Sequence, residues 1–139
     1  EIMECVAPLG SVYQAGTLSG NPCAVAAGIA TLKQIESTPD IYEALDKKSA
    51  VLEEAMKSAG LNVNRCGSLM TAFFNSKKVV SYDESRACDT EKYAEYYRHL
   101  LRNGIYAAPS QFEAMFVSYA HTAEDIERTA EIIKAFNGE

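Results

Sequence analysis

Residues 21–36 are the part of this 139-residue chain that most restricts how it can fold. Asn21-Pro22 has the pattern of a helix N-cap followed by a first-turn proline, and the Ala-rich stretch after it predicts a helix that ends near Glu36. The interior of this helix, from Cys23 to Leu32, is apolar on almost every side. Such a helix is normally buried on several sides, and a chain of this length offers little to surround it. We therefore expect a covering surface outside the rest of the chain.

Short strands and helices are predicted to alternate after this helix. Apolar residues at three-to-four spacing, with the stem of Lys48 along the same face, predict a second helix. Gly104 has the pattern of a helix C-cap, and Thr122-x-x-Asp125 resembles a capping box that opens the last helix. The predicted helices span 39–60, 90–103 and residue 122 to a point before Gly138, and the predicted strands span 61–65, 69–75, 78–81, 105–108 and 115–119.

This order predicts an α+β fold with a short, mostly antiparallel sheet and helices on one face. We assign residues 39–139 to this α+β domain and residues 1–38 to a preceding loop and linking helix. Tyr93, Tyr96, Tyr97 and Leu100 recur at helical spacing, which favours a place in the core or its rim over a cofactor site.

The charge balance restricts the partners of the chain. Lys and Arg number 13 against 19 Asp and Glu, so the net charge of −6 argues against a nucleic-acid or anionic-membrane partner. The longest run of apolar residues or glycine, Cys23 to Ala30, has eight residues, whereas spanning a bilayer takes about twenty. The chain begins at Glu1 without a signal or transit pattern, so either a start was removed or this is a piece of a longer protein.

The four cysteines, at positions 5, 23, 66 and 88, form no Cys-x-x-Cys pair. Neither histidine lies near a cysteine in the sequence, so we expect no metal site. Free thiols in a reducing cytoplasm are the favoured interpretation.

Two segments could carry chemistry. In Tyr13 to Pro22, hydroxyl and amide side chains and two glycines precede a helix N-terminus, which is a plausible phosphate cradle; the alternative is a plain loop with an ordinary N-cap. In Ala107 to Glu113, a polar loop between two predicted strands could present Gln111 and Glu113 to a ligand, or it could be a simple connector. For His121 a structural hydrogen bond is favoured over catalysis, and His99 is expected on a solvated helix face.

The same segments resemble a known family. Val12-Tyr13-Gln14-Ala15-Gly16-Thr17-Leu18-Ser19-Gly20-Asn21-Pro22, Pro109-Ser110-Gln111-Phe112-Glu113-Ala114 and Ser118-Tyr119-Ala120-His121-Thr122 are similar to segments of the glutamate-1-semialdehyde 2,1-aminomutases. These are isomerases of the class III pyridoxal-phosphate aminotransferase group, with fold type I. The resemblance covers the whole chain, which would be the C-terminal third of the enzyme, and the Pro-Ser-Gln-Phe-Glu-Ala segment is the most specific part.

The resemblance implies roles for particular residues. Thr17, with the Gly16 backbone beside it, would reach the cofactor phosphate of the neighbouring subunit in a homodimer. The Schiff-base lysine would lie upstream, so no catalytic residue is expected in this chain, and residues 1–38 would be the tail end of the large cofactor domain. Relatives that transaminate α-amino acids place an arginine near the position of Glu113 to bind the α-carboxylate, and this loop has none.

The implied reaction moves the amino group of glutamate 1-semialdehyde to the adjacent carbon and gives 5-aminolevulinate, a tetrapyrrole precursor. We expect the chain to be inactive alone and the full enzyme to be a cytoplasmic homodimer acting on a small molecule. The alternatives are the C-terminal part of another class III aminotransferase and a free-standing, non-catalytic α+β module that binds an anion.

Overall fold

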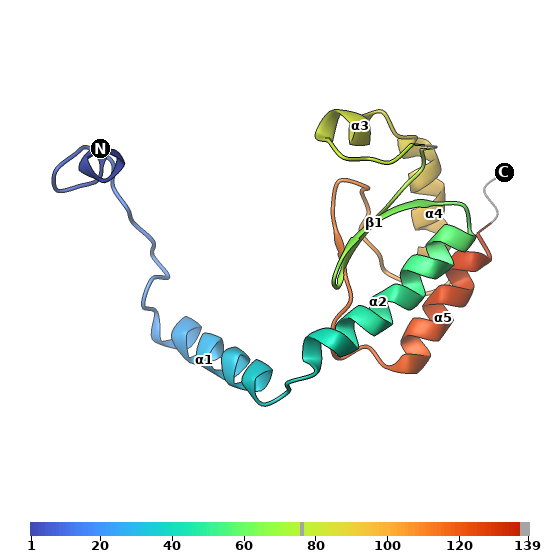
Figure 1. Ribbon diagram of the computed structural model, residues 1–139, viewed down its shortest axis with the longest axis horizontal. Helices are drawn as coiled ribbons and strands as arrows, with labels where there is room; N and C mark the ends of the chain where they lie inside the picture. The colour runs from blue at the N-terminus through green and yellow to red at the C-terminus, as the bar shows by residue number, and fades with distance from the viewer. Residues whose placement is uncertain (76, 137–139) are drawn as a thin grey trace. The chain divides into compact units, whose positions relative to one another are not determined.

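The computed structural model describes residues 1–75 and 77–136, which fall into two compact units, Glu1–Pro39 and Asp40–Glu139 (Figure 1). We call them the N-terminal unit and the C-terminal unit. The N-terminal unit contains a short 3-10 helix, η1 (Ile2–Cys5), and α1 (Pro22–Glu36). No residue of this unit is buried.

Helix α1 begins where the sequence predicts. The side chain of Asn21 accepts a hydrogen bond from the Ala24 N–H at 3.1 Å, and Pro22 occupies the first turn. Its apolar side chains stay accessible: Val25, Ile29 and Leu32 are 47%, 49% and 67% exposed. The apolar surface of this helix is therefore not covered by the described residues.

The C-terminal unit is an α+β layer, as predicted. Its elements are α2 (Ile41–Ser58), β1 (Asn62–Cys66), β2 (Leu69–Phe73), α3 (Tyr82–Arg86), α4 (Thr90–Arg102), β3 (Met115–Phe116) and α5 (Ala123–Lys134). The described strands form an antiparallel sheet in the order β1-β2-β3, with Val63 opposite Ala72 and Met70 opposite Met115. Helices α2 and α5 run side by side (Figure 1).

One hydrophobic core joins the sheet to three helices. Met70 and Ala72 alternate on β2 and pack in the same buried cluster as Met56 of α2, Tyr96 of α4 and Ile133 of α5. The predicted core positions of α4 are confirmed, because Tyr93, Tyr96 and Leu100 are all buried. A second, smaller buried cluster consists of Phe73, Val79 and Cys88, which brackets α3 in the sequence.

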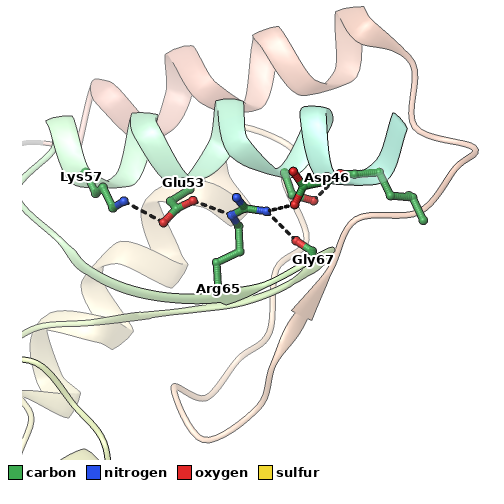
Figure 2. Close-up of polar contacts among 7 residues, drawn as sticks. Asp46, Glu53, Lys57, Arg65 and Gly67 are labelled. Carbon is green, nitrogen blue, oxygen red and sulfur yellow. Dashed lines mark hydrogen bonds and ion pairs between the residues drawn. The ribbon is translucent and has the colours of Figure 1, made fainter. Parts of the chain in front are cut away.

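An ion-pair network fastens β1 to α2 (Figure 2). Arg65 of β1 binds Glu53 through Nε at 2.5 Å and Asp46 through Nη1 at 2.6 Å, and Nη1 also donates to the Gly67 carbonyl at 2.9 Å. Lys57 contacts the other oxygen of Glu53 at 2.7 Å. Arg65 and Glu53 are only 18% and 19% exposed, so this network is partly shielded from solvent. We call these five residues the Arg65 cluster.

The predicted strand at 78–81 is wrong. Two side-chain amides of β1 bind this segment: Asn62 donates to the Lys77 carbonyl, and Asn64 donates to the Val79 carbonyl at 2.8 Å. Because side chains rather than backbone groups make these bonds, the segment lies beside β1 without strand pairing.

Helix α3, which we did not predict, follows this segment. The side chain of Ser81 accepts from the Glu84 N–H at 3.3 Å, and Glu84 Oε2 accepts from the N–H groups of Val80 at 2.7 Å and Ser81 at 3.0 Å. These bonds hold the pKa of Glu84 below its usual value, with the Val80 N–H as the largest cause. A capping box therefore begins a helix where we expected a strand to end.

The second half of the predicted sheet is also shorter than expected. Residues 105–108 form no strand, because the Ile105 N–H bonds back to the Leu100 carbonyl at 2.9 Å and the Tyr93 hydroxyl donates to the Ala108 carbonyl at 2.8 Å. The strand predicted over 115–119 is reduced to Met115–Phe116.

The last helix begins with the predicted capping box of Thr122 and Asp125 and ends at Lys134. Its predicted limit, Gly138, lies outside the described residues. Among the helices of the described ranges, none has the length and apolarity needed to cross a membrane.

Candidate functional site

In the N-terminal unit, the candidate phosphate cradle is a tight turn before α1. The Ser19 N–H donates to the Gly16 carbonyl at 3.0 Å, and the Asn21 N–H donates to the Leu18 carbonyl at 3.1 Å. A Cβ atom on Gly16 would lie 2.6 Å from Ser19 Oγ, so the approach of this hydroxyl requires a glycine. Thr17 is exposed on the same turn.

The start of α1 contributes fewer free donors than the sequence suggests. Pro22 has no N–H, the Asn21 side chain accepts the Ala24 N–H, and the Val25 N–H donates to the Asn21 carbonyl at 2.9 Å. Binding of an anion would therefore depend mainly on the hydroxyls of Thr17 and Ser19. These residues fit a phosphate group, because no Asp or Glu occurs between Glu4 and Glu36 to repel it.

In the C-terminal unit, the loop 109–114 carries the other two candidates. The Glu113 N–H donates to the Ser110 carbonyl at 3.1 Å, and this bond closes a turn. Gln111 is turned inward: it is 3% exposed, and its Nε2 donates to the Ser85 carbonyl at 2.8 Å. Glu113, in the same turn, is exposed. Whether either residue contacts a substrate stays a prediction.

A cavity of about 480 Å³ lies beside this loop. Its walls are mainly apolar side chains of α2, α4, β3 and α5, together with residues 105–109. Its lining also includes the polar or charged residues Glu113, His121, Asp125 and Thr129 and the tyrosines Tyr96 and Tyr106. The carboxyl of Asp125 has a lowered pKa, because it accepts hydrogen bonds from the Thr122 side chain and backbone. The cavity thus combines an apolar interior with carboxylates.

Tyr93 makes a hydrogen bond to the residue that precedes this loop. Its hydroxyl donates to the Ala108 carbonyl, and burial, with the Glu113 carboxylate as a second cause, raises the pKa of Tyr93 to about 12. The neighbouring Tyr96 lines the cavity, and burial raises its pKa further still. Its hydroxyl has no hydrogen-bond partner among the described residues.

The structure also shows contacts that sequence patterns do not reveal. Lys48 Nζ donates to the carbonyls of Tyr119 and His121 at 3.1 and 2.6 Å, across more than 70 positions. His121 makes the structural hydrogen bond that we predicted, since its Nδ1 accepts the Ser118 N–H at 2.9 Å. The prediction for His99 is wrong: this side chain is half-buried, and its Nε2 donates to the Ile132 carbonyl at 2.8 Å.

The four candidate residues fall into two groups. Gly16 and Thr17 belong to the N-terminal unit, and Gln111 and Glu113 belong to the C-terminal unit, so the structure defines each pair separately. Within the described ranges, no three His, Cys, Asp or Glu residues gather as they would around a metal ion.

Solved structures with a similar fold identify the class of protein. A β-phenylalanine aminotransferase from Variovorax paradoxus has a TM-score of 0.75 and 27% identity, over 96% of this chain and 32% of that one. A transaminase with bound PLP has a TM-score of 0.70 and 25% identity, over 95% of this chain and 31% of that one. The chain therefore has the fold of the small C-terminal domain of PLP-dependent aminotransferases, as predicted.

Sequence relatives are more specific. Glutamate-1-semialdehyde 2,1-aminomutases from Acetivibrio thermocellus and Pelotomaculum thermopropionicum are 51% and 54% identical to this chain, over 98% and 94% of its length. The predicted resemblance to the C-terminal segment of this family is thus confirmed. The chain spans about a third of the length of these relatives, 32% and 31%. No family model matches it.

Proposed function

We propose that this chain is the C-terminal part of a glutamate-1-semialdehyde 2,1-aminomutase, a cytoplasmic homodimer that converts glutamate 1-semialdehyde to 5-aminolevulinate for tetrapyrrole (porphyrin) biosynthesis. The observation that carries the proposal is the identity of about half of all positions to enzymes of this name, over nearly the whole chain. The C-terminal unit supplies the small domain, and residues 1–38 belong to the cofactor domain.

Pyridoxal phosphate is the proposed cofactor. When bound, it supplies the electron-withdrawing ring that makes bonds at an amino-bearing carbon labile. The Thr17 hydroxyl would donate to its phosphate, and Gly16 would let the backbone approach closely. As in our sequence prediction, Thr17 serves the site of the neighbouring subunit.

Glu113 would select the substrate. The loop that carries it contains no arginine, and Glu113 is one of the residues that line the cavity. A carboxylate there repels the α-carboxylate of an ordinary amino acid. Glutamate 1-semialdehyde has an aldehyde beside its amino carbon, so it escapes this repulsion.

Another class III aminotransferase is the second candidate, because the structural neighbours include a β-phenylalanine aminotransferase. The third possibility is a non-catalytic module that uses only the anion-binding turn. Product analysis separates all three: an aminomutase forms 5-aminolevulinate without a second amino acceptor, an aminotransferase needs that acceptor, and a binding module forms no product.

The test is a chimera in which residues 1–139 replace the matching segment of the Acetivibrio thermocellus relative. We expect the chimera, supplied with pyridoxal phosphate, to form 5-aminolevulinate, and the 139-residue chain alone to form none, because none of its lysines has the sequence context of the cofactor-binding lysine. A chimera that folds and binds the cofactor but only transaminates would contradict the proposal. Formation of 5-aminolevulinate by the chain alone would contradict its inactivity.

The role of Thr17 is tested in the same chimera. Thr17→Val should weaken cofactor binding by about 1–3 kcal/mol, the usual range for a hydrogen bond to a charged group. Thr31→Val is the matched control, because the Thr31 hydroxyl donates within α1, to the Ala27 carbonyl at 3.0 Å. Mixed dimers of the Thr17 variant and a variant without the catalytic lysine should recover activity if the threonine acts across subunits.

A further inference from the structure

Gln111 is the one buried residue of the loop 109–114, and only one of the two polar atoms of its amide has a hydrogen-bond partner among the described residues. Its Nε2 donates to the Ser85 carbonyl at 2.8 Å, whereas its Oε1 is buried and has no partner within the described ranges. A buried carbonyl oxygen without a donor costs free energy, and this cost offsets part of what the hydrogen bond of Nε2 contributes. The amide therefore contributes less to the stability of the whole fold than a fully paired amide would.

The Ser85 carbonyl does not depend on Gln111 either. It also accepts the Cys88 N–H at 3.3 Å, so removal of the glutamine leaves this carbonyl paired. An apolar side chain of similar length would fill the same space. What only the amide provides is a directed link between the loop and α3.

That link acts on the position of Glu113. Gln111 and Glu113 belong to the same turn, which the Glu113 N–H closes on the Ser110 carbonyl. Helix α3 begins with a complete capping box, formed by Ser81 and Glu84. The ring of Phe112 adds a contact with Tyr82 of α3, with centroids 6.2 Å apart. Both contacts hold one side of the turn against α3 while the Glu113 side chain remains exposed.

We propose that Gln111 is a positioning residue: its amide holds the loop 109–114 on α3 and so places the Glu113 carboxylate that excludes substrates with an α-carboxylate. The proposal rests on the function proposed above for Glu113. It assigns to Gln111 a role in substrate selection without direct contact with the substrate.

Gln111→Met separates this role from a structural one, because methionine keeps the buried volume and removes the amide. Hydrogen exchange on the 139-residue chain measures directly how often the loop 109–114 opens. We expect the Glu113 amide to exchange about 2- to 10-fold faster, as follows from the loss of one hydrogen bond, while the unfolding midpoint stays unchanged. Unchanged exchange at 110–114, or a large fall in the midpoint, would overturn the proposal.

The chimera measures the effect of Gln111 on substrate selection. The readout is the ratio of kcat/KM for glutamate 1-semialdehyde to kcat/KM for transamination of an α-amino acid such as alanine. We expect Gln111→Met to lower this ratio about tenfold. The double variant with Glu113→Gln should lower it no further than Glu113→Gln alone, because Gln111 acts through Glu113. His99→Leu is the control, since it also removes a 2.8 Å side-chain bond to a carbonyl.

Failure of the two proposals can be distinguished. If Glu113→Gln leaves the ratio unchanged while Gln111→Met still accelerates exchange at Glu113, the role of Glu113 is refuted and the positioning of the loop stands. If Glu113→Gln lowers the ratio and Gln111→Met does not, the positioning role is refuted. If His99→Leu lowers the ratio as much as Gln111→Met, the effect is a general loss of stability, which also refutes it.

Discussion

At the scale of single residues, Tyr93 and Tyr96 lie one turn apart on α4 and are both buried, but their hydroxyls differ. That of Tyr93 donates to the Ala108 carbonyl, and that of Tyr96 has no partner within residues 1–75 and 77–136. Tyr93→Phe should lower the free energy of unfolding by about 1 kcal/mol, and Tyr96→Phe should leave it unchanged or raise it by about 1 kcal/mol. Urea denaturation measures both, and equal losses would contradict the assignment.

The Arg65 cluster gives a pH-dependent prediction. Hydrogen bonds from Lys57 and then from Arg65 hold the pKa of Glu53 below its ordinary value of 4.5. A lowered pKa in the folded state stabilises the fold fully above that ordinary value, and the stabilisation is lost as the pH falls through the folded-state pKa. Arg65→Met should therefore cost about 1–2 kcal/mol at pH 7 and clearly less in acid.

Denaturant titrations of both proteins at a series of pH values between 3 and 7 would measure this difference. Lys47→Met is the control, because Lys47 pairs with Glu43 on the exposed surface of α2 and should cost almost nothing. A cost for Arg65→Met that does not change with pH would show that the arginine stabilises the fold through packing and its bond to the Gly67 carbonyl rather than through the carboxylates.

At the scale of elements, a threonine just before α5 and a threonine inside it test the capping box. The Thr122 hydroxyl accepts the Asp125 N–H at 3.1 Å at the helix start, whereas the Thr129 hydroxyl donates to the Asp125 carbonyl inside the helix. Thr122→Ala should cost about 1 kcal/mol. Thr129→Ala should be neutral or stabilising, because alanine is the better helix former. Thermal unfolding distinguishes them, and equal shifts would contradict a specific cap.

Helices and strands of this chain differ in how far local sequence predicts them. Helices with local signals were predicted, such as α1 with Asn21-Pro22 and α5 with Thr122-x-x-Asp125. Helix α3 had such a signal too, because Ser81 stands three residues before Glu84, and the strand assigned to 78–81 concealed it. The strands at 78–81 and 105–108 were wrong because distant side chains, those of Asn64 and Tyr93, bind backbone carbonyls there.

The candidate site shows what local patterns omit. Sequence marked Gln111 and Glu113 as one polar loop, but only the contact with Ser85, 26 positions away, turns the glutamine inward. Likewise, the spacing predicts that the stem of Lys48 lies along an apolar helix face, and nothing local indicates that its ammonium group binds the carbonyls of Tyr119 and His121. Such contacts depend on tertiary packing.

At the scale of the whole molecule, α1 should drive association of the 139-residue chain. Val25, Ile29 and Leu32 lie on one face of the helix and are exposed. We expect the sedimentation coefficient to rise with concentration, and Ile29→Glu to abolish that rise. Val80→Glu, at a residue 72% exposed in the C-terminal unit, is the control. A chain that stays monomeric with residues 1–36 protected from hydrogen exchange would contradict this prediction.

Because three of the four thiols are exposed and one is buried, thiol labelling can report local opening of the fold. Cys5, Cys23 and Cys66 are exposed, and Cys88 is 7% exposed between Phe73 and Val79. An alkylating reagent should therefore label three positions at once and the fourth only when the segment around α3 detaches from β2. Intact-mass spectra would resolve the triply and quadruply labelled species. The rate of the fourth addition would then measure how fast the segment around α3 opens. This is the helix that the loop 109–114 contacts.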